Sequence, residues 1–361
     1  MRIIFGIIGL MALSLNAQMP KVKGYHYIVG TSYELPRKGV YYWWDSTGTA
    51  KMKGLDADSA SENKEVFMMK GIQGFGISET EVTNQEWWEF VFAAVDSACK
   101  GQSTGDRMKD LAKLLKLDTC VKCDNSISIW MANKGRNQIY FDGVPVLPSY
   151  SCWLEDFPYG QMQPMADYYF PHVSYAGYPV VGISKEQALA YCRWRTQQFK
   201  SKLKNGDIQH WEFALPTESQ FIAAAMHIPD NKKRMKGYAP YLPFTRNSKG
   251  QFLLNYNAYM DQKEPNHFIF SDGYMTTCPV FSYYPNQNGL YNLHGNVAEW
   301  TCSEVEPTAG VKSSMPLYKV KGGSYMDPAP CVWARSFTAL PASKGDARVG
   351  FRMVLVSKKG A

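Results

Sequence analysis

Residues 289–300 read Gly-Leu-Tyr-Asn-Leu-His-Gly-Asn-Val-Ala-Glu-Trp. Glycine and asparagine are frequent in this stretch, and both are typical of turns and irregular loops. The residues just before it, 283–289, have the same character and read Tyr-Tyr-Pro-Asn-Gln-Asn-Gly. Such segments predict a fold in which extensive loops connect short helices and strands.

Three segments outside this stretch share the sequence pattern of a helix start. They are Thr-Asn-Gln-Glu at 83–86, Ser-Lys-Glu-Gln at 184–187 and Thr-Glu-Ser-Gln at 217–220. In such a capping box, the hydroxyl and the Glu or Gln side chain satisfy free N–H groups of the first turn. We therefore expect short, widely spaced helices after these starts. Short strands are expected at residues 180–183, 317–321, 332–337 and 351–356. This pattern predicts an α+β fold rather than a series of βαβ units.

The composition excludes several classes of protein. The chain has 361 residues, of which 14% are aromatic and 20% are charged, and its net charge is +7. A disordered chain would be poorer in aromatic residues, and a disulfide-dense mini-protein would be much shorter. The mild basic surplus is not the dense basic stripe of a nucleic-acid binder, so no nucleic-acid partner is expected. We expect one large domain or two small ones.

The first residues predict export. A basic Arg2 precedes an almost wholly apolar run, and Ala17 closes it. About 13 apolar residues are too few to cross a bilayer, which requires ~20. This pattern is typical of a secretory signal peptide over residues 1–17; a buried N-terminal strand or helix is the alternative. Because no cysteine follows the apolar run, we expect an exported protein that is not evidently a lipoprotein.

Eight cysteines give an even count, which allows full pairing. Cys120 and Cys123 have the spacing of a zinc or redox pair. However, no second pair follows for zinc, and the surrounding polar loop does not suit a redox motif. Structural disulfides or buried thiols are therefore preferred.

The chain divides into an N-terminal extension over residues 18–66 and a domain over residues 67–361 with an insertion at about 99–175. The extension contains the aromatic run 41–44. The insertion contains an amphipathic stretch at 108–117, for which we expect docking onto its own domain, with a partner-binding helix as the alternative.

Several further motifs occur in a fixed order: residues 77–84, 178–184, 215–218, 289–300, 321–324, 334–336 and 349–352. Together they closely resemble the formylglycine-generating-enzyme (sulfatase-modifying factor) family, from about residue 67 to 356. The resemblance implies a loop-rich variant of the C-type lectin fold.

The resemblance also implies where an active site would lie. Family enzymes oxidise a substrate cysteine with two cysteines that bind copper, and the first stands three positions after Ser324. Here that position is Asp327, and Cys331 is the candidate for the second. Ala298 replaces a family tryptophan. One thiolate with a carboxylate is a poor ligand set for copper(I), which prefers thiolates. We expect a degenerate site, without copper or oxidase activity; an oxidase that uses Cys331 is the alternative.

The family's calcium positions are better matched. The resemblance implies one Ca²⁺ at Asn292, Gly295, Val297 and Glu299, through two side chains and two carbonyls. It implies a second at Asn257 and Asp272, through side chains, and at Ala258 and Tyr274, through carbonyls. Several oxygen donors of this kind suit Ca²⁺. Loops held by Asx turns without metal are the alternative.

Within the family, residues 167–182 and 190–196 resemble the gliding-motility and type IX secretion proteins of the GldK/PorK and GldJ kind, from Bacteroidota. That resemblance implies a structural component of an envelope machine in the periplasm. Its expected partners are other secretion or motility proteins, in a ring or hetero-oligomer. Contact with the outer membrane or peptidoglycan is also expected. A glycan- or peptidoglycan-binding module is another reading. It requires Trp43, Trp44, Trp130 and Trp153 to be exposed on one face.

Overall fold

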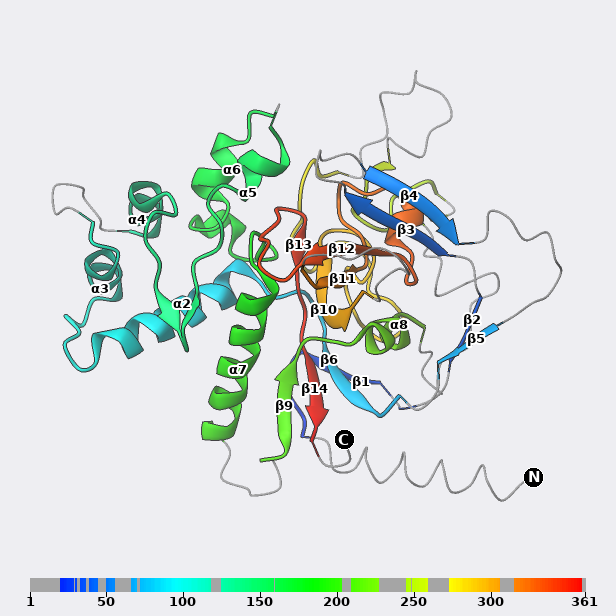
Figure 1. The fold of residues 1–361 in the computed structure, drawn as a ribbon, viewed down its shortest axis with the longest axis horizontal. Helices are drawn as coiled ribbons and strands as arrows, with labels where there is room; N and C mark the ends of the chain where they lie inside the picture. The colour runs from blue at the N-terminus through cyan, green and yellow to red at the C-terminus, as the bar shows by residue number, and fades with distance from the viewer. Residues whose placement is uncertain are drawn as a thin grey trace.

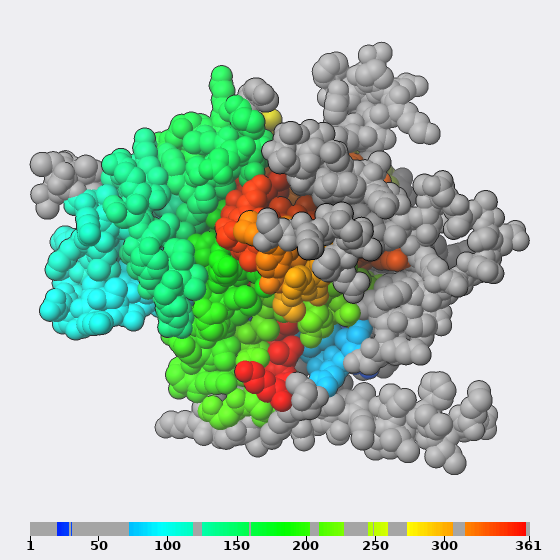
Figure 2. Space-filling view, viewed as in Figure 1, coloured from blue at the N-terminus to red at the C-terminus, as the bar shows by residue number. Residues whose placement is uncertain are grey.

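The structure is a computed structural model, and it describes residues 20–28, 30, 72–117, 125–158, 160–202, 209–226, 245–247, 249–258, 273–305 and 315–358, together with the backbone of strands at 33–36, 39–44, 50–55 and 66–69. Helices α2 to α7 gather on one side, and the sheets lie at the centre and on the other side (Figure 1). In the space-filling view the helical side projects from the body at the left (Figure 2). The expected mixture of helix, strand and loop is confirmed.

The three capping boxes each start a helix, as predicted. They precede α2 (Asn84–Cys99), α7 (Lys185–Lys202) and α8 (Glu218–Met226). Before α7, for example, the amide of Gln187 donates to Ser184 Oγ at 3.2 Å, and the amide of Ser184 donates to Gln187 Oε1 at 2.8 Å. The expectation of short helices was wrong for α2 and α7, which have 16 and 18 residues. Both are long because they bury apolar side chains along their length, which stabilises a helix beyond its capped first turn.

The insertion forms small helices that pack on one another and, through the first of them, on α2. They are α3 (Arg107–Leu114), α4 (Ser126–Asn133), α5 (Cys152–Asp156), α6 (Gln163–Tyr168) and the 3₁₀ turn η1 (Val173–Tyr175). A two-stranded ribbon, β7 (Tyr140–Phe141) and β8 (Val144–Pro145), lies between α4 and α5. The apolar face of α3 is buried through Leu111 and Leu115 in the main core. The helix therefore docks onto its own domain, as expected.

Two sheets form the rest of the body. One is antiparallel, in the order β1 (Tyr25–Ile28), β6 (Phe75–Ser78), β14 (Val354–Ser357), β9 (Trp211–Ala214). The other is mixed, in the order β13 (Val349–Gly350), β10 (Ala298–Glu304), β11 (Leu317–Lys321), β12 (Phe337–Pro341), β3 (Gly39–Trp44), β4 (Ala50–Leu55). A separate pair joins β2 (Tyr33–Pro36) and β5 (Val66–Met69).

The strand predictions had mixed outcomes. Residues 317–321 form β11 as predicted, and 351–356 overlap β14. Residues 180–183 form no strand, because Gly182 has φ +70° and a Cβ there would lie 2.7 Å from Cys152 Sγ. The strand predicted at residues 332–337 was also wrong. The prolines before them favour the 3₁₀ turn η4 (Ala329–Val332), and Phe337 only begins β12.

The N-terminal stretch contributes to both sheets. Strand β1 pairs with β6, with Tyr25 opposite Ser78, and β3 pairs in parallel with β12, with Tyr41 opposite Phe337. The boundaries at 18–66 and 99–175 stay predictions. The proposed signal peptide, residues 1–17, lies outside the described residues.

Aromatic side chains fill the main core. Trp87 stacks on Tyr191 with ring centroids 5.3 Å apart, and Phe90 and Phe351 pack edge-on against Trp87. Large rings of this kind each bury ~150–250 Å², which stabilises loops that have few ladder hydrogen bonds.

No disulfide joins any two of the six cysteines in the described part of the chain: Cys99, Cys152, Cys192, Cys278, Cys302 and Cys331. Cys120 and Cys123 lie outside it. Among the described residues no helix combines the length and apolarity needed to cross a membrane.

Candidate functional site

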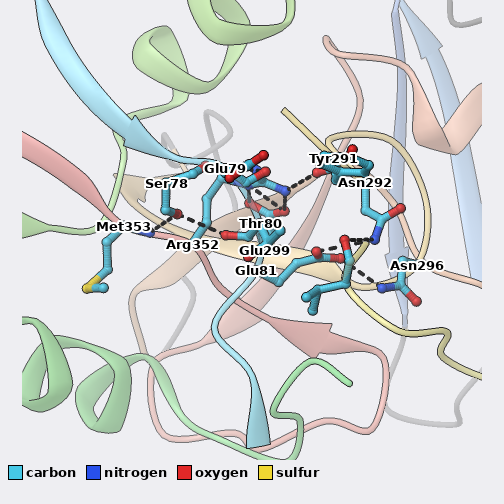
Figure 3. Close-up of polar contacts among 11 residues, drawn as sticks. Ser78, Glu79, Thr80, Glu81, Tyr291, Asn292, Asn296, Glu299, Arg352 and Met353 are labelled. Carbon is cyan, nitrogen blue, oxygen red and sulfur yellow. Dashed lines mark hydrogen bonds and ion pairs between the residues drawn. The ribbon is translucent and has the colours of Figure 1, made fainter. Parts of the chain in front are cut away.

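A buried ion pair joins Arg352 to Glu299, near the end of the 289–300 stretch (Figure 3). Arg352 Nε donates to both carboxylate oxygens of Glu299 at 2.7–2.8 Å, and its Nη2 donates to the first of them at 2.7 Å. The same guanidinium donates to the carbonyls of Tyr291 at 2.7 Å, Ser78 at 3.2 Å and Glu79 at 3.3 Å. Arg352 therefore connects β10, β6 and the loop in one network. Burial disfavours its charge, but the Glu299 carboxylate outweighs that and raises the pKa of Arg352.

A second carboxyl group, Glu81, is buried beside this pair (Figure 3). Asn296 Nδ2 donates to one of its oxygens at 2.8 Å, and Asn292 Nδ2 donates to the other at 3.3 Å. Burial raises the pKa of Glu81 to about 8; Arg352 opposes this shift and Glu299 adds to it. The Arg352 guanidinium thus favours the charged form of two buried carboxyl groups, Glu299 and Glu81. With a pKa of about 8, Glu81 is mostly protonated near neutral pH.

The loop reaches this geometry through left-handed backbone at three positions. Asn292, Gly295 and Asn296 have φ of 48°, 78° and 60°. A Cβ on Gly295 would lie 2.2 Å from the carbonyl oxygen of Asn255, so only glycine fits. Asparagine tolerates positive φ better than most residues, and here both asparagine side chains bind Glu81. The Gly-Asn pattern of the sequence is thus required by this turn.

The residues of the first predicted calcium position come from one stretch of chain: Asn292, Gly295 and Val297 precede β10, and Glu299 is its second residue. The donor types fit Ca²⁺, which binds carboxylate, amide and carbonyl oxygens. Glu299 accepts from Arg352, but a carboxylate has about four acceptor positions and retains capacity for a cation. Among the described residues no group of three His, Cys, Asp or Glu side chains could hold a metal, so carbonyl oxygens would supply part of the set.

The second predicted calcium position is only partly described. Asn257 Nδ2 donates to the carbonyl of Met326 at 3.3 Å, Ala258 is buried, and Tyr274 is 37% exposed. Asp272, its only carboxylate, lies outside the described residues. This position stays a prediction.

Two of the three positions predicted to form a degenerate active site line a small pocket between β10, β11 and β12. Ser324, Asp327 and Ala298 all face it. The amide and hydroxyl of Ser324 donate to Asp327 Oδ2 at 2.8 and 2.7 Å. Burial raises the pKa of Asp327, and the Ser324 hydrogen bonds oppose that shift. The pocket volume is about 10 Å³, which is room for about one water molecule.

Cys331, the candidate second copper ligand, is buried in η4 and does not line this pocket. The structure therefore brings Ser324, Asp327 and Ala298 to one pocket, and Cys331 is not among the residues that line it.

Charged residues that the sequence did not single out complete the pocket. Arg348 binds Asp346 through two hydrogen bonds of 2.6 and 2.8 Å, and both line the pocket. Burial acts against the charge of Asp346, but Arg348 outweighs it and lowers the pKa of Asp346 to about 2. Asp156, from the insertion, accepts from the amide of Ala347 at 2.8 Å, and burial raises its pKa to about 6. The Asp346–Arg348 ion pair thus forms part of the pocket wall, with Asp156 close to it.

The roles of Glu81, Arg352, Asp346 and Arg348 were missed at the sequence level. Glu81 and Arg352 stand inside motifs given above. For Arg352, the charge at the end of the otherwise apolar stretch 349–352 was the available signal, whereas Glu81 stands in a polar motif that gives no such signal. No such signal in the sequence marks Asp346 and Arg348.

A family model described as "Sulfatase-modifying factor enzyme 1-like domain" matches residues 46–356. The chain belongs to this family. The match begins inside the stretch 18–66, between β3 and β4.

Curated relatives of the family include enzymes and a protein named inactive. The chain is 31% identical over 160 residues to the formylglycine-generating enzyme of Mus musculus. This alignment covers 42% of this chain and 36% of that protein. It is 30% identical over 152 residues to the "Inactive C-alpha-formylglycine-generating enzyme 2" of Mus musculus, covering 42% and 39%. The formylglycine-generating enzyme of Mycobacterium tuberculosis is 24% identical over 321 residues, covering 78% and 88%.

The chain thus spans less than two-fifths of the length of the two mouse relatives. Among solved structures, PvdO from Pseudomonas aeruginosa aligns with a TM-score of 0.46 and 16% identity, over 92% of this chain and 93% of that one.

Proposed function

We propose that this protein is a non-catalytic member of the family that acts through protein–protein contacts as a structural component of an exported envelope assembly. The type IX secretion and gliding-motility machinery is the assembly that the sequence resemblance favours. The exported, periplasmic location in this proposal is based on residues 1–17 of the sequence.

The observation that carries the proposal is the Ser324–Asp327 pair. A copper-binding oxidase of this type needs a thiolate where Asp327 stands, and a carboxylate is a poor ligand for copper(I). The Asp327 carboxylate is instead bound to its own turn, in a pocket with room for about one water molecule. A relative named inactive, at 30% identity, supports a family member without the named activity.

An exposed apolar surface supports the protein-contact part of the proposal. Residues 168–178 and 273–284 contain no Asp, Glu, Lys or Arg, and they lie side by side through a hydrogen bond from the amide of Val280 to the carbonyl of Gly177. Met275, Phe281 and Tyr284 are 92%, 62% and 72% exposed there. Aromatic and methionine side chains without charges are typical of the core of a protein interface.

The glycan-binding alternative has less support. Trp130 and Trp153 are buried, at 4% and 3% exposure, and Trp130 Nε1 donates to the carbonyl of Ala166. The side chains of Trp43 and Trp44 lie outside the described part of the structure. The required exposed row of rings is therefore absent at the two positions that are described.

We further propose one structural Ca²⁺ at the 292–299 turn and a fold that is a variant of the C-type lectin fold. The ion would be held by Asn292 and Glu299 with the carbonyls of Gly295 and Val297, and it would stabilise the turn without taking part in a reaction.

The proposal is tested by assembly. Mature protein should form a homo-oligomer in sedimentation velocity, or capture one stoichiometric partner in cross-linking pull-downs from its native envelope. Met275→Asp with Tyr284→Asp should abolish that association. Tyr140→Asp, at another exposed aromatic position, is the matched control and should retain it. A protein that remains monomeric and captures no partner would contradict the proposal.

A further inference from the structure

Helix α5 of the insertion packs against the turn that carries the Ser324–Asp327 pair. Tyr325, within this turn, is buried, and the ring of Trp153 from α5 stacks on it with ring centroids 6.4 Å apart. Phe157, which directly follows α5, stacks on the same tyrosine ring at 6.4 Å. Two aromatic side chains of the insertion therefore hold α5 against the turn.

The same helix contacts the segment 342–348, which leads into β13 (Figure 1). Asp156, the last residue of α5, accepts a hydrogen bond from the amide of Ala347 at 2.8 Å. The phenol of Tyr325 donates to the carbonyl of Ala347 at 3.4 Å, so both polar groups of this backbone residue are bound. We call the contacts of residues 152–157 with the 324–327 turn and the 342–348 segment the α5 contact.

Two carboxyl groups are buried close together in the α5 contact. The Asp156 side chain is 7% exposed and that of Asp346 is 0% exposed. Lys344 Nζ lies 3.7 Å from a carboxylate oxygen of Asp156 and 3.4 Å from one of Asp346, so the two groups share this cation. Arg348, by contrast, binds Asp346 at 2.6 Å. Asp156 is therefore the less compensated of the two carboxyl groups.

This arrangement makes Asp156 the carboxyl group that changes its charge near neutral pH. A neighbouring carboxylate and a buried position both disfavour ionisation. Burial, followed by the Asp346 carboxylate, raises the pKa of Asp156 to about 6, although the Ala347 amide, Arg348 and Lys344 oppose the shift. Arg348 holds the pKa of Asp346 at about 2, so Asp346 stays charged while Asp156 titrates.

Other titratable groups around α5 are bound within their own elements or stay neutral. Burial raises the pKa of the Cys152 thiol and of the Tyr325 phenol well above their ordinary values, so both stay neutral. The remaining carboxyl groups bind local hydrogen-bond donors: Glu155 binds Ser151 at 2.5 Å in α5, Asp167 binds Gln163 at 3.0 Å in α6, and Asp327 binds Ser324 at 2.7 Å in the turn. Asp156 is thus the carboxyl group that joins α5 to the 342–348 segment.

We propose that the α5 contact is pH-sensitive: it holds the Ser324–Asp327 turn and the 342–348 segment firmly at acidic pH and loosens when Asp156 becomes charged. When α5 is docked as in the structure, the raised pKa means that Asp156 binds its proton more tightly than in the undocked state. Docking therefore gains most below the ordinary pKa of 3.8 and loses this gain as the pH rises through about 6. The inference goes beyond the proposed function and does not depend on it.

Amide hydrogen exchange of the purified protein tests the proposal at the Ala347 amide. Its protection, corrected for the intrinsic exchange rate at each pH, should be about tenfold higher at pH 5 than at pH 7.5. It should also be lower than that of the Ser78 amide, which binds the Met353 carbonyl at 2.9 Å in the central sheet. Equal protection of the two amides would show that α5 undocks only when the whole protein unfolds, and would overturn the proposal.

Asp156→Asn separates this carboxyl group from other sources of pH dependence, such as Glu81. The amide retains an oxygen that can accept from Ala347, but it cannot ionise. Protection of Ala347 in this variant should be the same at pH 5 and pH 7.5, apart from any change shared with Ser78. A variant that keeps the tenfold change of the unmodified protein would overturn the proposal.

Two further variants complete the test. Glu155→Gln removes the adjacent carboxyl group of the same helix and is the matched control, so it should keep the tenfold change. Lys344→Met removes a cation that favours the charged form of Asp156, so the fall in Ala347 protection should move to higher pH. The proposal fails if Glu155→Gln abolishes the change as Asp156→Asn does, or if Lys344→Met leaves the pH of the fall where it is.

Discussion

Ser324 donates two hydrogen bonds to one oxygen of Asp327, from its amide at 2.8 Å and from its hydroxyl at 2.7 Å. Asp327 stands where the family resemblance implies the first copper-binding cysteine. The carboxylate is thus hydrogen-bonded within its own turn. We propose that this pair has a structural role and no catalytic one.

Breaking the buried ion pair should be costly. Arg352→Met leaves Glu299 as a buried charge without its partner, and we expect a loss of about 3–5 kcal/mol in the free energy of unfolding. Arg107→Met removes an exposed arginine from its pair with Asp96 and should cost about 0–1 kcal/mol. Urea unfolding of both variants measures the difference. Equal losses would show that Arg352 does not organise the loop.

The buried Glu81 should make stability depend on pH. Its pKa is raised from 4.5 to about 8 in the folded protein, so the folded state binds this proton more tightly than the unfolded chain. Its contribution to stability is then full below about pH 4.5 and is lost as the pH rises through about 8. Glu81→Gln, which cannot ionise, should flatten the fall in melting temperature over this range. Parallel curves for the two proteins, measured with chelator present, would contradict the assignment.

Calcium removal tests the proposed metal at the 292–299 turn. A ligand that binds only the folded state stabilises it, so chelation should lower the melting temperature and added Ca²⁺ should restore it. Mg²⁺ should restore it poorly, because it requires a stricter octahedral geometry than Ca²⁺ and gives up its waters reluctantly. A melting temperature that chelation leaves unchanged would show that the turn is held by Glu81 and Arg352 without metal.

The capping box of α7 should contribute measurably to stability. Ser184→Ala removes the hydroxyl that accepts from the amide of Gln187, and we expect a loss of about 1 kcal/mol. Ser201→Ala, in the last turn of the same helix, is the matched control and should be close to neutral. Equal effects in urea unfolding would show that the loss reflects something other than the cap.

The sequence was sufficient where the determinants are local. The capping boxes need only four consecutive residues, and the position of Asp327 follows from counting along a motif. It was insufficient where buried groups meet from distant segments: Arg352 binds Glu299 across 53 positions, and Glu81 binds Asn296 across 215. The expected strand at 180–183 failed for a related reason. Gly182 has φ +70° and leaves no room for a Cβ beside Cys152 Sγ, an arrangement that is visible only in three dimensions.

The central claim is the absence of oxidase activity, and oxygen consumption tests it most directly. Purified mature protein is supplied with copper(I), a reductant and a cysteine-containing peptide, with an active formylglycine-generating enzyme as a parallel positive control. We predict that oxygen consumption equals that of the same mixture without the protein. Copper-dependent consumption that is lost in Cys331→Ser would contradict this prediction and identify the protein as an oxidase that uses Cys331.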